Sequence, residues 1–263
     1  MSAAETVSIE KGFANRVAAL TAVAGVFPVI GSLVQGPVSD APQNYLANLL
    51  YYDSHSSAVL VGSGMRGIGL FVSVVPVIYL LRAALARGAK IPRITPALAI
   101  IGSVLLGVGT IALAALYVDA SSSFAQSGGL SYDEAKNVLK GQAIIAVSMA
   151  SLLGSLAIAF AFVMASLNAM RVGLLTRFMG YIGMFAGVLI ILPIFSPLPI
   201  VQAFWLLAVA AVIVGRWPGG RPLAWDDGEA HPWPSAAEVR AQAAEARELA
   251  ESEKGASKNG KGA

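Results

Sequence analysis

Arg66 is the residue whose type and position could do chemistry. It lies near the start of the apolar run VGSGMRGIGLFVSVVPVIYLLR, residues 61–82, and is the one charged side chain well inside a run of membrane length. A guanidinium at such a position can reach the membrane surface, pair with a carboxylate, or bind an anionic or polar ligand. Which of these it does decides between the main functional hypotheses.

The separation between Arg66 and Arg82 favours the membrane surface. Arg82 follows Arg66 by 16 positions, which correspond to about 24 Å of helix at 1.5 Å per residue. If Arg82 marks one edge of a hydrocarbon layer about 30 Å thick, Arg66 lies about 6 Å inside the other edge, where its side chain can reach the headgroups. An ion pair with Asp119 or Asp53, and a ligand site at the outer mouth, are the alternatives.

Other reactive groups are scarce in the sequence. The chain has no cysteine, and its apolar runs contain no Asp, Glu or His, so thiolate sites, intramembrane proton relays and paired aspartates are not expected. His55 and Asp53 in YYDSHSS could form half of a metal or acid–base site outside the membrane, without a third ligand in the sequence nearby. We therefore expect no metal, no cofactor and no enzymatic activity.

The elements that must position these residues are membrane helices. The 263 residues are 56% hydrophobic and 13% charged, with a mean hydropathy of +0.70, whereas soluble domains carry about 25% charged residues. The longest uncharged run, Phe178–Gly215, is too long for one crossing and contains the turn sequence SPLP, so it counts as two spans. We predict an all-α polytopic bundle of six transmembrane helices, at about 14–35, 61–82, 95–118, 142–168, 178–195 and 199–216.

Basic residues gather on one side of this predicted bundle. Ten of the 18 Lys and Arg residues share the side of the N-terminus: Lys11, Arg16, Arg82, Arg87, Lys90, Arg93, Arg171, Arg177, Arg216 and Arg221. The positive-inside rule then places both termini in the cytoplasm, as expected for a multi-pass protein of a bacterial inner membrane. Glu5 and Glu10 argue against a cleaved leader. The position of the basic residues beside the spans argues for the lipid bilayer, and against nucleic acid, as the partner.

Segments outside the spans also carry helical signals. SDAPQNYLANLLYY and SYDEAKNVLKG, in the two long outer loops, predict short interfacial helices, and Ser131 with Glu134 forms a capping box in the second. Residues 217–234 are rich in Pro, Gly and Trp and predict an irregular linker. Residues 235–254 predict a cytosolic helix, followed by a disordered tail at 255–263. The outer loops or the cytosolic helix could meet a protein partner.

Small residues at helical spacing predict close contacts between the spans. Gly183 and Gly187 form a GxxxG motif in the fifth span, and Ala150 with Gly154 forms a small-xxx-small pair in the fourth. We expect these two spans to pack closely, either within one chain or between two copies of a homo-oligomer. Gln202 in the sixth span is a further polar residue that could line a path through the bundle.

The first half of the chain resembles a family of uncharacterised bacterial six-span integral membrane proteins. The resemblance covers about residues 13–118 and rests on an outer loop helix, the arginine-bearing MRGIG, and IYLLRAAL before a basic inner loop. It implies a six-span membrane fold and supplies no catalytic residues.

Three functional hypotheses follow, in this order. The first is a non-enzymatic accessory or scaffold component of the membrane. The alternative is a small-solute transporter or channel with Arg66 at its outer mouth and with proline-bent spans along its path. An outer-leaflet enzyme at Asp53 and His55 comes last. A transporter should have a polar cavity that Arg66 lines, whereas a scaffold should have a dry, close-packed core.

Overall fold

All the regular structure in the described part of the chain is helical. The computed structural model describes residues 2–36, 45–127, 131–192 and 199–234, together with residues 238, 240, 241 and 244. Contacts divide the chain into two units, Met1–His231 and Pro232–Ala263, and the first unit contains the helices α1 to α10. Apart from the four single positions, which are helical, the predicted helix at 235–254 and the predicted tail at 255–263 lie outside the described residues.

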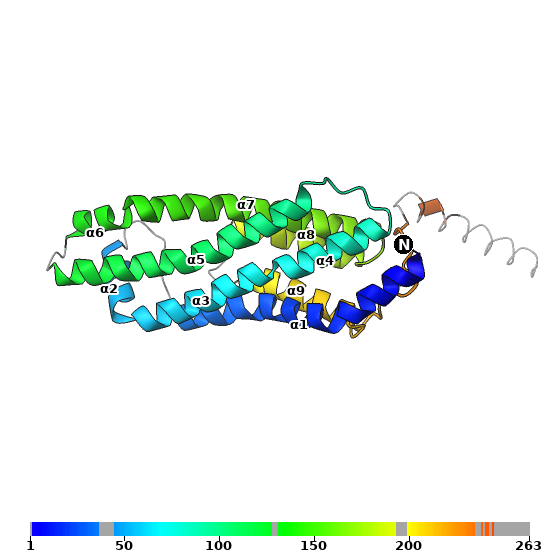
Figure 1. Cartoon of the computed structure of the whole chain (residues 1–263), viewed down its shortest axis with the longest axis horizontal. Helices are drawn as coiled ribbons and strands as arrows, with labels where there is room; N and C mark the ends of the chain where they lie inside the picture. Colours follow the sequence, from blue (N-terminus) through cyan, green and yellow to red (C-terminus); the bar gives the residue numbers. More distant parts are fainter. Residues whose placement is uncertain are drawn as a thin grey trace, which may run out of the picture. The chain divides into compact units, whose positions relative to one another are not determined.

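Four helices are long and apolar enough to cross a membrane (Figure 1). They are α1 (Ala3–Gln35), α3 continued by α4 (Ser56–Val72 and Val74–Ala86), α5 (Thr95–Gln126) and α7 (Gln142–Arg171). They contain between 30 and 33 residues, roughly 45–50 Å at 1.5 Å per residue. Most of each apolar stretch is not buried inside the protein, which suits a helix that faces lipid. The prediction of an all-α fold with membrane-spanning helices is confirmed at this level.

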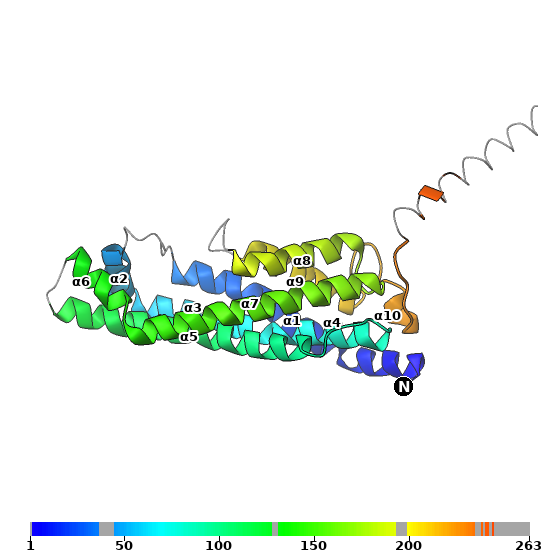
Figure 2. The same cartoon turned by 90° about the horizontal axis from the view of Figure 1, so that it is seen from above.

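The two remaining apolar helices, α8 (Arg177–Ile191) and α9 (Ile200–Ile213), are short. Their 15 and 14 residues extend only about 21–23 Å, less than the roughly 30 Å of a hydrocarbon layer. Figure 2 shows them beside the long helices, toward the end at which α10 lies. They occupy most of the predicted fifth and sixth spans, while residues 193–198, which include most of the predicted turn sequence SPLP, lie outside the described residues. Six crossings therefore stay a prediction.

Local chemistry explains where the helices begin and bend. The Ser2 hydroxyl accepts a hydrogen bond from the Glu5 backbone N–H (3.3 Å), so α1 begins at Ala3, well before the predicted span. The second predicted span is a helix that is interrupted at Ser73, which separates α3 from α4. Pro76 explains the interruption, because it has no N–H for the carbonyl four residues earlier and its ring crowds that carbonyl.

Glycines bring the backbones of the long helices together. A Cβ atom at Gly62 of α3 would lie 2.5 Å from the Gly31 carbonyl oxygen of α1. A Cβ atom at Gly102 of α5 would lie 2.5 Å from the backbone nitrogen of Ile158 on α7. No side chain larger than hydrogen fits at such crossings, so α1 meets α3 and α5 meets α7 at their backbones.

The small residues predicted to join the fourth and fifth spans serve two different contacts. Gly187 of α8 lies against α7, where an added Cβ would be 3.0 Å from a carbonyl oxygen, and Gly183 lies against side chains of α7 and α9. Gly154 of α7 instead faces α5, where an added Cβ would lie 2.8 Å from a backbone nitrogen, and Ala150 is half-buried one turn earlier on α7. The GxxxG motif thus packs within one chain, and Gly154 belongs to the α5–α7 contact.

One end of the bundle, which we name the α6 end, is closed by two short helices. These are α2 (Tyr45–Ser54) and α6 (Tyr132–Leu139), which contact each other and α5. The rings of Tyr45 and Tyr132 stack with centroids 5.9 Å apart. The Ser131 hydroxyl accepts a hydrogen bond from the Glu134 N–H (3.3 Å), which confirms the predicted cap of α6. The corresponding signals before α2 lie outside the described residues.

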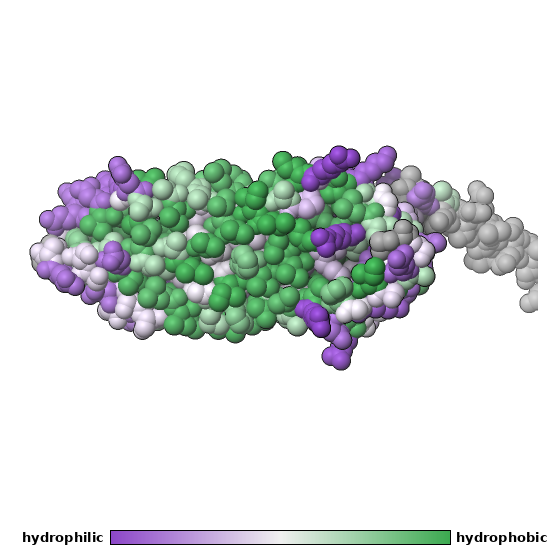
Figure 3. Space-filling model, viewed as in Figure 1, coloured by the Kyte–Doolittle hydropathy of each residue, from purple (hydrophilic) through white to green (hydrophobic). Residues whose placement is uncertain are grey.

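The opposite end, the α10 end, contains the first turns of α1 and the short helix α10 (Ala224–Asp227). The linker predicted at 217–234 therefore includes a helical turn that docks on the bundle. On the face shown in Figure 3, hydrophobic residues cover the middle of the bundle and hydrophilic residues gather toward its two ends. This distribution is the one expected of a protein whose middle lies in hydrocarbon.

Candidate functional site

Arg66 forms a hydrogen bond with Gln35, the last residue of α1. Its Nη1 donates to the Gln35 side-chain oxygen at 2.8 Å, and the Ser63 hydroxyl donates to the same oxygen at 3.4 Å. The close crossing of α1 and α3 at Gly31 and Gly62 explains this contact, because it brings the end of α1 beside the second and third turns of α3. Sequence reasoning did not identify Gln35, although a large polar side chain at the end of an apolar run was the available signal.

The two carboxylates proposed as partners of Arg66 lie elsewhere. Asp53 is exposed on α2, and Asp119 is exposed on α5, which continues past the predicted span to Gln126. Within the described residues, the ion pairs are Glu10–Arg87, Arg221–Asp226 and Asp227–His231, and neither Asp53 nor Asp119 is paired with Arg66. The structure thus brings Arg66 to an amide rather than to either predicted carboxylate.

Arg66 also lines a cavity of about 690 Å³ between the helices. The cavity lies in the half of the bundle toward the α6 end, among residues of α1, α3, α5, α7 and the facing ends of α8 and α9. Its volume falls within the range of about 300–1,000 Å³ that is usual for small-molecule sites. The alternative hypothesis, in which Arg66 faces a cavity, thus matches the geometry more closely than a dry core does.

The polar groups of the cavity are hydroxyls and amides that are already held in place. The Ser32 hydroxyl donates to the Pro28 carbonyl (2.8 Å) and the Thr110 hydroxyl donates to the Leu106 carbonyl (2.7 Å), and both residues line the cavity. Gln202, singled out in the sequence, lines the cavity and donates to a carbonyl of α8 at 3.3 Å. Together with Arg66 and Gln35, these groups can recognise a polar or anionic ligand.

Apolar side chains form the rest of the lining. Ile158 and Phe162 of α7 and Leu206 of α9 are almost fully buried at one side of the cavity. Leu192 and Ile200, at the facing ends of α8 and α9, also line it and are 46% and 60% exposed. The site therefore combines one cationic region with a larger apolar region, an arrangement suited to binding rather than to acid–base chemistry.

The third predicted site, at His55 and Asp53, does not gather a catalytic set. His55 lies between α2 and α3, where its ring stacks on Tyr51 at 4.3 Å and its Nδ1 lies 2.9 Å from the Ser54 hydroxyl. Among the described residues, no group of three His, Cys, Asp or Glu side chains could hold a metal ion. The role of this segment is visible in Tyr51, whose hydroxyl donates to the Gln35 carbonyl (2.8 Å) and ties α2 to the end of α1.

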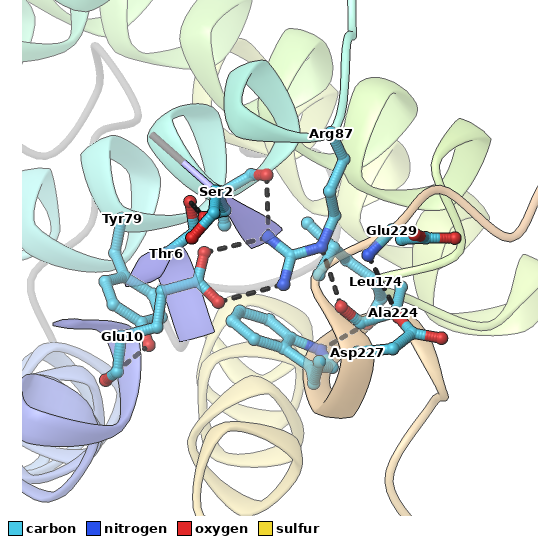
Figure 4. A network of polar contacts seen from close by, with 11 residues as sticks. Ser2, Thr6, Glu10, Tyr79, Arg87, Leu174, Ala224, Asp227 and Glu229 are labelled. Carbon is cyan, nitrogen blue, oxygen red and sulfur yellow. Dashed lines mark hydrogen bonds and ion pairs between the residues drawn. The ribbon is translucent and has the colours of Figure 1, made fainter. Parts of the chain in front are cut away.

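A second arginine site lies at the α10 end and was not foreseen from the sequence. Arg87 donates to both carboxylate oxygens of Glu10, at 2.8 and 2.9 Å, and to the backbone carbonyls of Ala83 and Ala224 (Figure 4). Its side chain is fully buried, and that of Glu10 is 10% exposed. The pair therefore ties α1, α4 and α10 together with two parallel hydrogen bonds between opposite charges.

Trp225 of α10 completes this second site. It is fully buried, its indole N–H donates to the Leu174 carbonyl (2.8 Å), and its ring stacks on Tyr79 with centroids 5.7 Å apart. The guanidinium carbons of Arg87 and Arg221 each lie 5.4 Å from its ring centroid. The sequence, with Pro, Gly and charged residues around this tryptophan, predicts an irregular linker. In the structure it is an anchor, because a large flat ring and an arginine stack well even in a short segment.

The exposed residues after α10 form a local acid–base pair. The Asp227 carboxylate accepts hydrogen bonds from the Glu229 backbone N–H (2.9 Å) and from the His231 ring. The backbone hydrogen bond and then the His231 contact hold the pKa of Asp227 below its ordinary value of 3.8. The His231 backbone N–H donates to the Val172 carbonyl (3.0 Å), so this segment also contacts the end of α7.

Comparison of the chain with protein-family models, with curated proteins and with solved structures finds no match. The resemblance of residues 13–118 to a bacterial six-span family therefore stays a prediction. The arguments about function that follow rest on the geometry of the chain alone.

Proposed function

We propose that the chain is a small-solute binding or transport protein of a bacterial inner membrane, which takes an anionic ligand into the Arg66 cavity. The observation that carries the proposal is the position of Arg66 on the wall of a cavity of about 690 Å³, with Gln35 as its hydrogen-bond partner. Arg66 contributes a cationic guanidinium to this wall. A cation on the wall of a partly apolar cavity attracts anions more strongly than one in open water.

The scaffold hypothesis accounts for fewer of these features. A scaffold needs neither the cavity nor the convergence of Arg66, Gln35 and Gln202 on it, and an arginine that only reaches the headgroups needs no partner from a neighbouring helix. The α10 end, with its buried ion pair and buried Trp225, is the part of the bundle that has the close packing expected of a structural element. Ligand binding is therefore the function that the α6 half of the bundle supports best.

For the membrane topology we propose six crossings with both termini in the cytoplasm. The start of α1 and helix α10 lie at the same end of the bundle, which supports an even number of crossings. The basic residues at the ends of α4, α7, α8 and α9 favour the α10 end as the cytoplasmic one. The α8–α9 hairpin then starts and finishes on the cytoplasmic side. Because these helices are shorter than the hydrocarbon layer is thick, the hairpin reaches the outer side only if the residues between them extend it or the bilayer is thinner there.

A thiol-protection measurement tests the proposed binding. The chain has no cysteine, so Thr110→Cys places a single thiol on the cavity wall, in protein held in nanodiscs of zwitterionic lipid. We expect decyl phosphate to protect this thiol from a maleimide reagent. Arg66→Gln should raise the concentration needed for half protection by about tenfold or more, because hydrogen bonds to charged groups contribute about 1.5–3 kcal/mol.

Two controls make the result specific. Arg82→Gln removes an exposed arginine on the same bent helix, away from the lining residues, and should leave protection unchanged. Val108→Cys places the thiol on the exposed face of α5, two residues before Thr110, and decyl phosphate should not protect it through Arg66. The proposal is overturned if neither decyl phosphate nor inorganic phosphate protects Thr110→Cys, or if Arg66→Gln leaves protection unchanged.

A further inference from the structure

Exposed basic residues mark the α10 end of the bundle. Arg16 of α1, Arg82 of α4 and Arg216 after α9 are exposed, and the ion pairs of the described residues involve none of them. Toward the α6 end, by contrast, the exposed charged residues of α2, α5 and α6 are acidic, and one exposed lysine, Lys140, follows α6. On the face shown in Figure 3, hydrophilic residues stand among hydrophobic ones toward the α10 end. This end is therefore the one that complements an anionic surface.

Helix α1 places Arg16 at an edge of the hydrocarbon layer. Gln35, the last residue of α1, follows Arg16 by 19 positions, or about 28 Å of helix, close to the roughly 30 Å of a hydrocarbon layer. Phe13 and Leu20 lie three positions before and four positions after Arg16, on the same face of α1, and both are exposed. Phe13 lies about 4.5 Å beyond Arg16 along the helix, at the level of the lipid headgroups.

Helix α9 ends at the same level as Arg16. A Cβ atom at Gly25 of α1 would lie 3.2 Å from the Ala203 carbonyl oxygen and 3.2 Å from the Leu206 Cβ of α9. The two helices run in opposite directions, since α1 begins and α9 ends toward the α10 end. Arg16 lies nine positions before Gly25, and Ile213, the last residue of α9, lies ten positions after Ala203. Arg216, three positions later, is therefore beside the same edge.

The turn after α9 holds an exposed leucine near this edge. A Cβ atom at Gly215 would lie 3.8 Å from the Arg221 Cδ, so the chain returns to the end of α9 before α10 begins. Leu223 follows two residues later and, at 66%, is the most exposed large hydrophobic side chain of the described residues. The next two residues, Ala224 and Trp225, are fully buried and hydrogen-bonded to the bundle. Leu223 is thus fixed in an outward position.

We infer that the α10 end binds the headgroups of anionic phospholipids in the leaflet that it meets. Arg16 and Arg216 donate hydrogen bonds to the phosphate oxygens, and Phe13 and Leu223 enter the boundary between headgroups and acyl chains. Guanidinium groups bind phosphates with two parallel hydrogen bonds, and basic side chains beside apolar ones are typical of surfaces that bind anionic lipid. This inference does not depend on the ligand of the Arg66 cavity.

Titration with short-chain lipids tests the headgroup contacts. Native mass spectrometry of the full chain in detergent micelles can count bound dioctanoylphosphatidylglycerol, which is anionic, and dioctanoylphosphatidylcholine, which is zwitterionic. We expect the anionic lipid to bind about tenfold more tightly. The double variant Arg16→Gln/Arg216→Gln should lose this preference, because each basic residue near a lipid surface contributes roughly fivefold in affinity. Binding of the zwitterionic lipid should stay within about twofold of the parent.

Three further variants make the result specific. Arg16→Lys/Arg216→Lys keeps both charges and should keep most of the preference. Lys136→Gln/Lys140→Gln removes the same charge at the α6 end and should leave the preference unchanged. Arg66→Gln should also leave it unchanged. The inference is overturned if Arg16→Gln/Arg216→Gln retains the preference, if the α6-end variant loses as much, or if the preference depends on Arg66 instead.

A fluorescence measurement tests the position of Leu223. The chain has no cysteine, so Leu223→Cys carries a single nitrobenzoxadiazole label in nanodiscs of equal parts phosphatidylglycerol and phosphatidylcholine. Lipids with a nitroxide near the carbonyl end of the acyl chain should quench this label. Glu5→Cys is the control, because it is exposed on α1 about 16 Å beyond Arg16 and should not be quenched. Equal fluorescence at the two positions on adding nitroxide lipid would overturn the insertion of Leu223.

Discussion

The two arginine sites at opposite ends of the bundle use the same side chain in opposite ways. Arg87 is fully buried and donates to the Glu10 carboxylate and to two backbone carbonyls, so its charge and most of its donors are satisfied within the protein. Arg66 is half-buried, donates to the neutral amide of Gln35 and lines a cavity. The first site is a buried structural pair, and the second lies beside a space that a ligand can fill.

The difference shows that the partner, rather than the arginine, decides the role. Removing a buried guanidinium from water is strongly unfavourable unless an opposite charge accompanies it, so Arg87 requires Glu10. A half-buried guanidinium keeps part of its hydration and can accept an amide partner. Exchanging the partners, so that Arg87 faces an amide and Arg66 faces a carboxylate, should therefore exchange the two behaviours.

Glu10→Gln should have the largest effect of the variants considered. It leaves Arg87 buried beside a neutral amide, and we expect the free energy of unfolding to fall by about 4 kcal/mol. Unfolding by SDS in mixed micelles measures this. Glu5→Gln, which removes an exposed carboxylate from the same helix, should change the unfolding free energy by less than about 0.5 kcal/mol. A Glu10→Gln loss below about 1 kcal/mol would mean that the pair behaves like a surface ion pair.

Trp225→Ala should have the next largest effect, and only at the α10 end. It removes a fully buried ring stacked on Tyr79 and leaves the Leu174 carbonyl without its hydrogen bond, at an expected cost of about 3 kcal/mol. Proteolysis within residues 217–231 should become faster, while decyl phosphate should still protect Thr110→Cys. Trp233→Ala, at a position that is 43% exposed, is the control. Loss of protection in Trp225→Ala would show that the two ends are coupled.

Gly62→Ala should lower the free energy of unfolding through the contact between α1 and α3 near Arg66. An alanine at Gly62 would place its Cβ 2.5 Å from the Gly31 carbonyl oxygen, so α1 and α3 must separate at an expected cost of about 2 kcal/mol. Gly64→Ala is a matched control on the same helix, since an added Cβ there meets no atom within 4 Å. Its unfolding free energy should equal or slightly exceed that of the parent. Equal losses in both variants would contradict the backbone contact at Gly62.

Gln35→Glu should have the smallest effect on stability and a selective effect on binding. It replaces the Gln35 amide that accepts from Arg66 with a carboxylate, and so adds a negative charge beside the cavity. The concentration of decyl phosphate for half protection should rise about tenfold, which corresponds to about 1.4 kcal/mol, while the unfolding free energy changes by less than about 1 kcal/mol. Unchanged protection in Gln35→Glu would mean that the charge of the pair does not hold the ligand.

The membrane character of the chain and several local features could be predicted, because they depend on short stretches of sequence. Uncharged runs of about 20 or more residues predict helices in lipid whatever their neighbours are, and the cap at Ser131 depends only on the residue three positions later. The shortness of α8 and α9 was harder to foresee. An apolar run shows how many residues are hydrophobic, but not at which of them α8 ends and α9 begins.

The amino-acid sequence by itself determined that this is an all-α protein with membrane-crossing helices, and that Arg66 is its exceptional residue, because hydropathy and charge are properties of single residues and runs. Only the tertiary structure decided which arginine is buried against a carboxylate and which one faces a cavity. Glu10 and Arg87 are 77 positions apart, and Gln35 and Arg66 are 31 apart, so these partners meet only through the helix crossings. Burial and pairing are properties of contacts, and contacts between distant segments exist only once the backbones have packed.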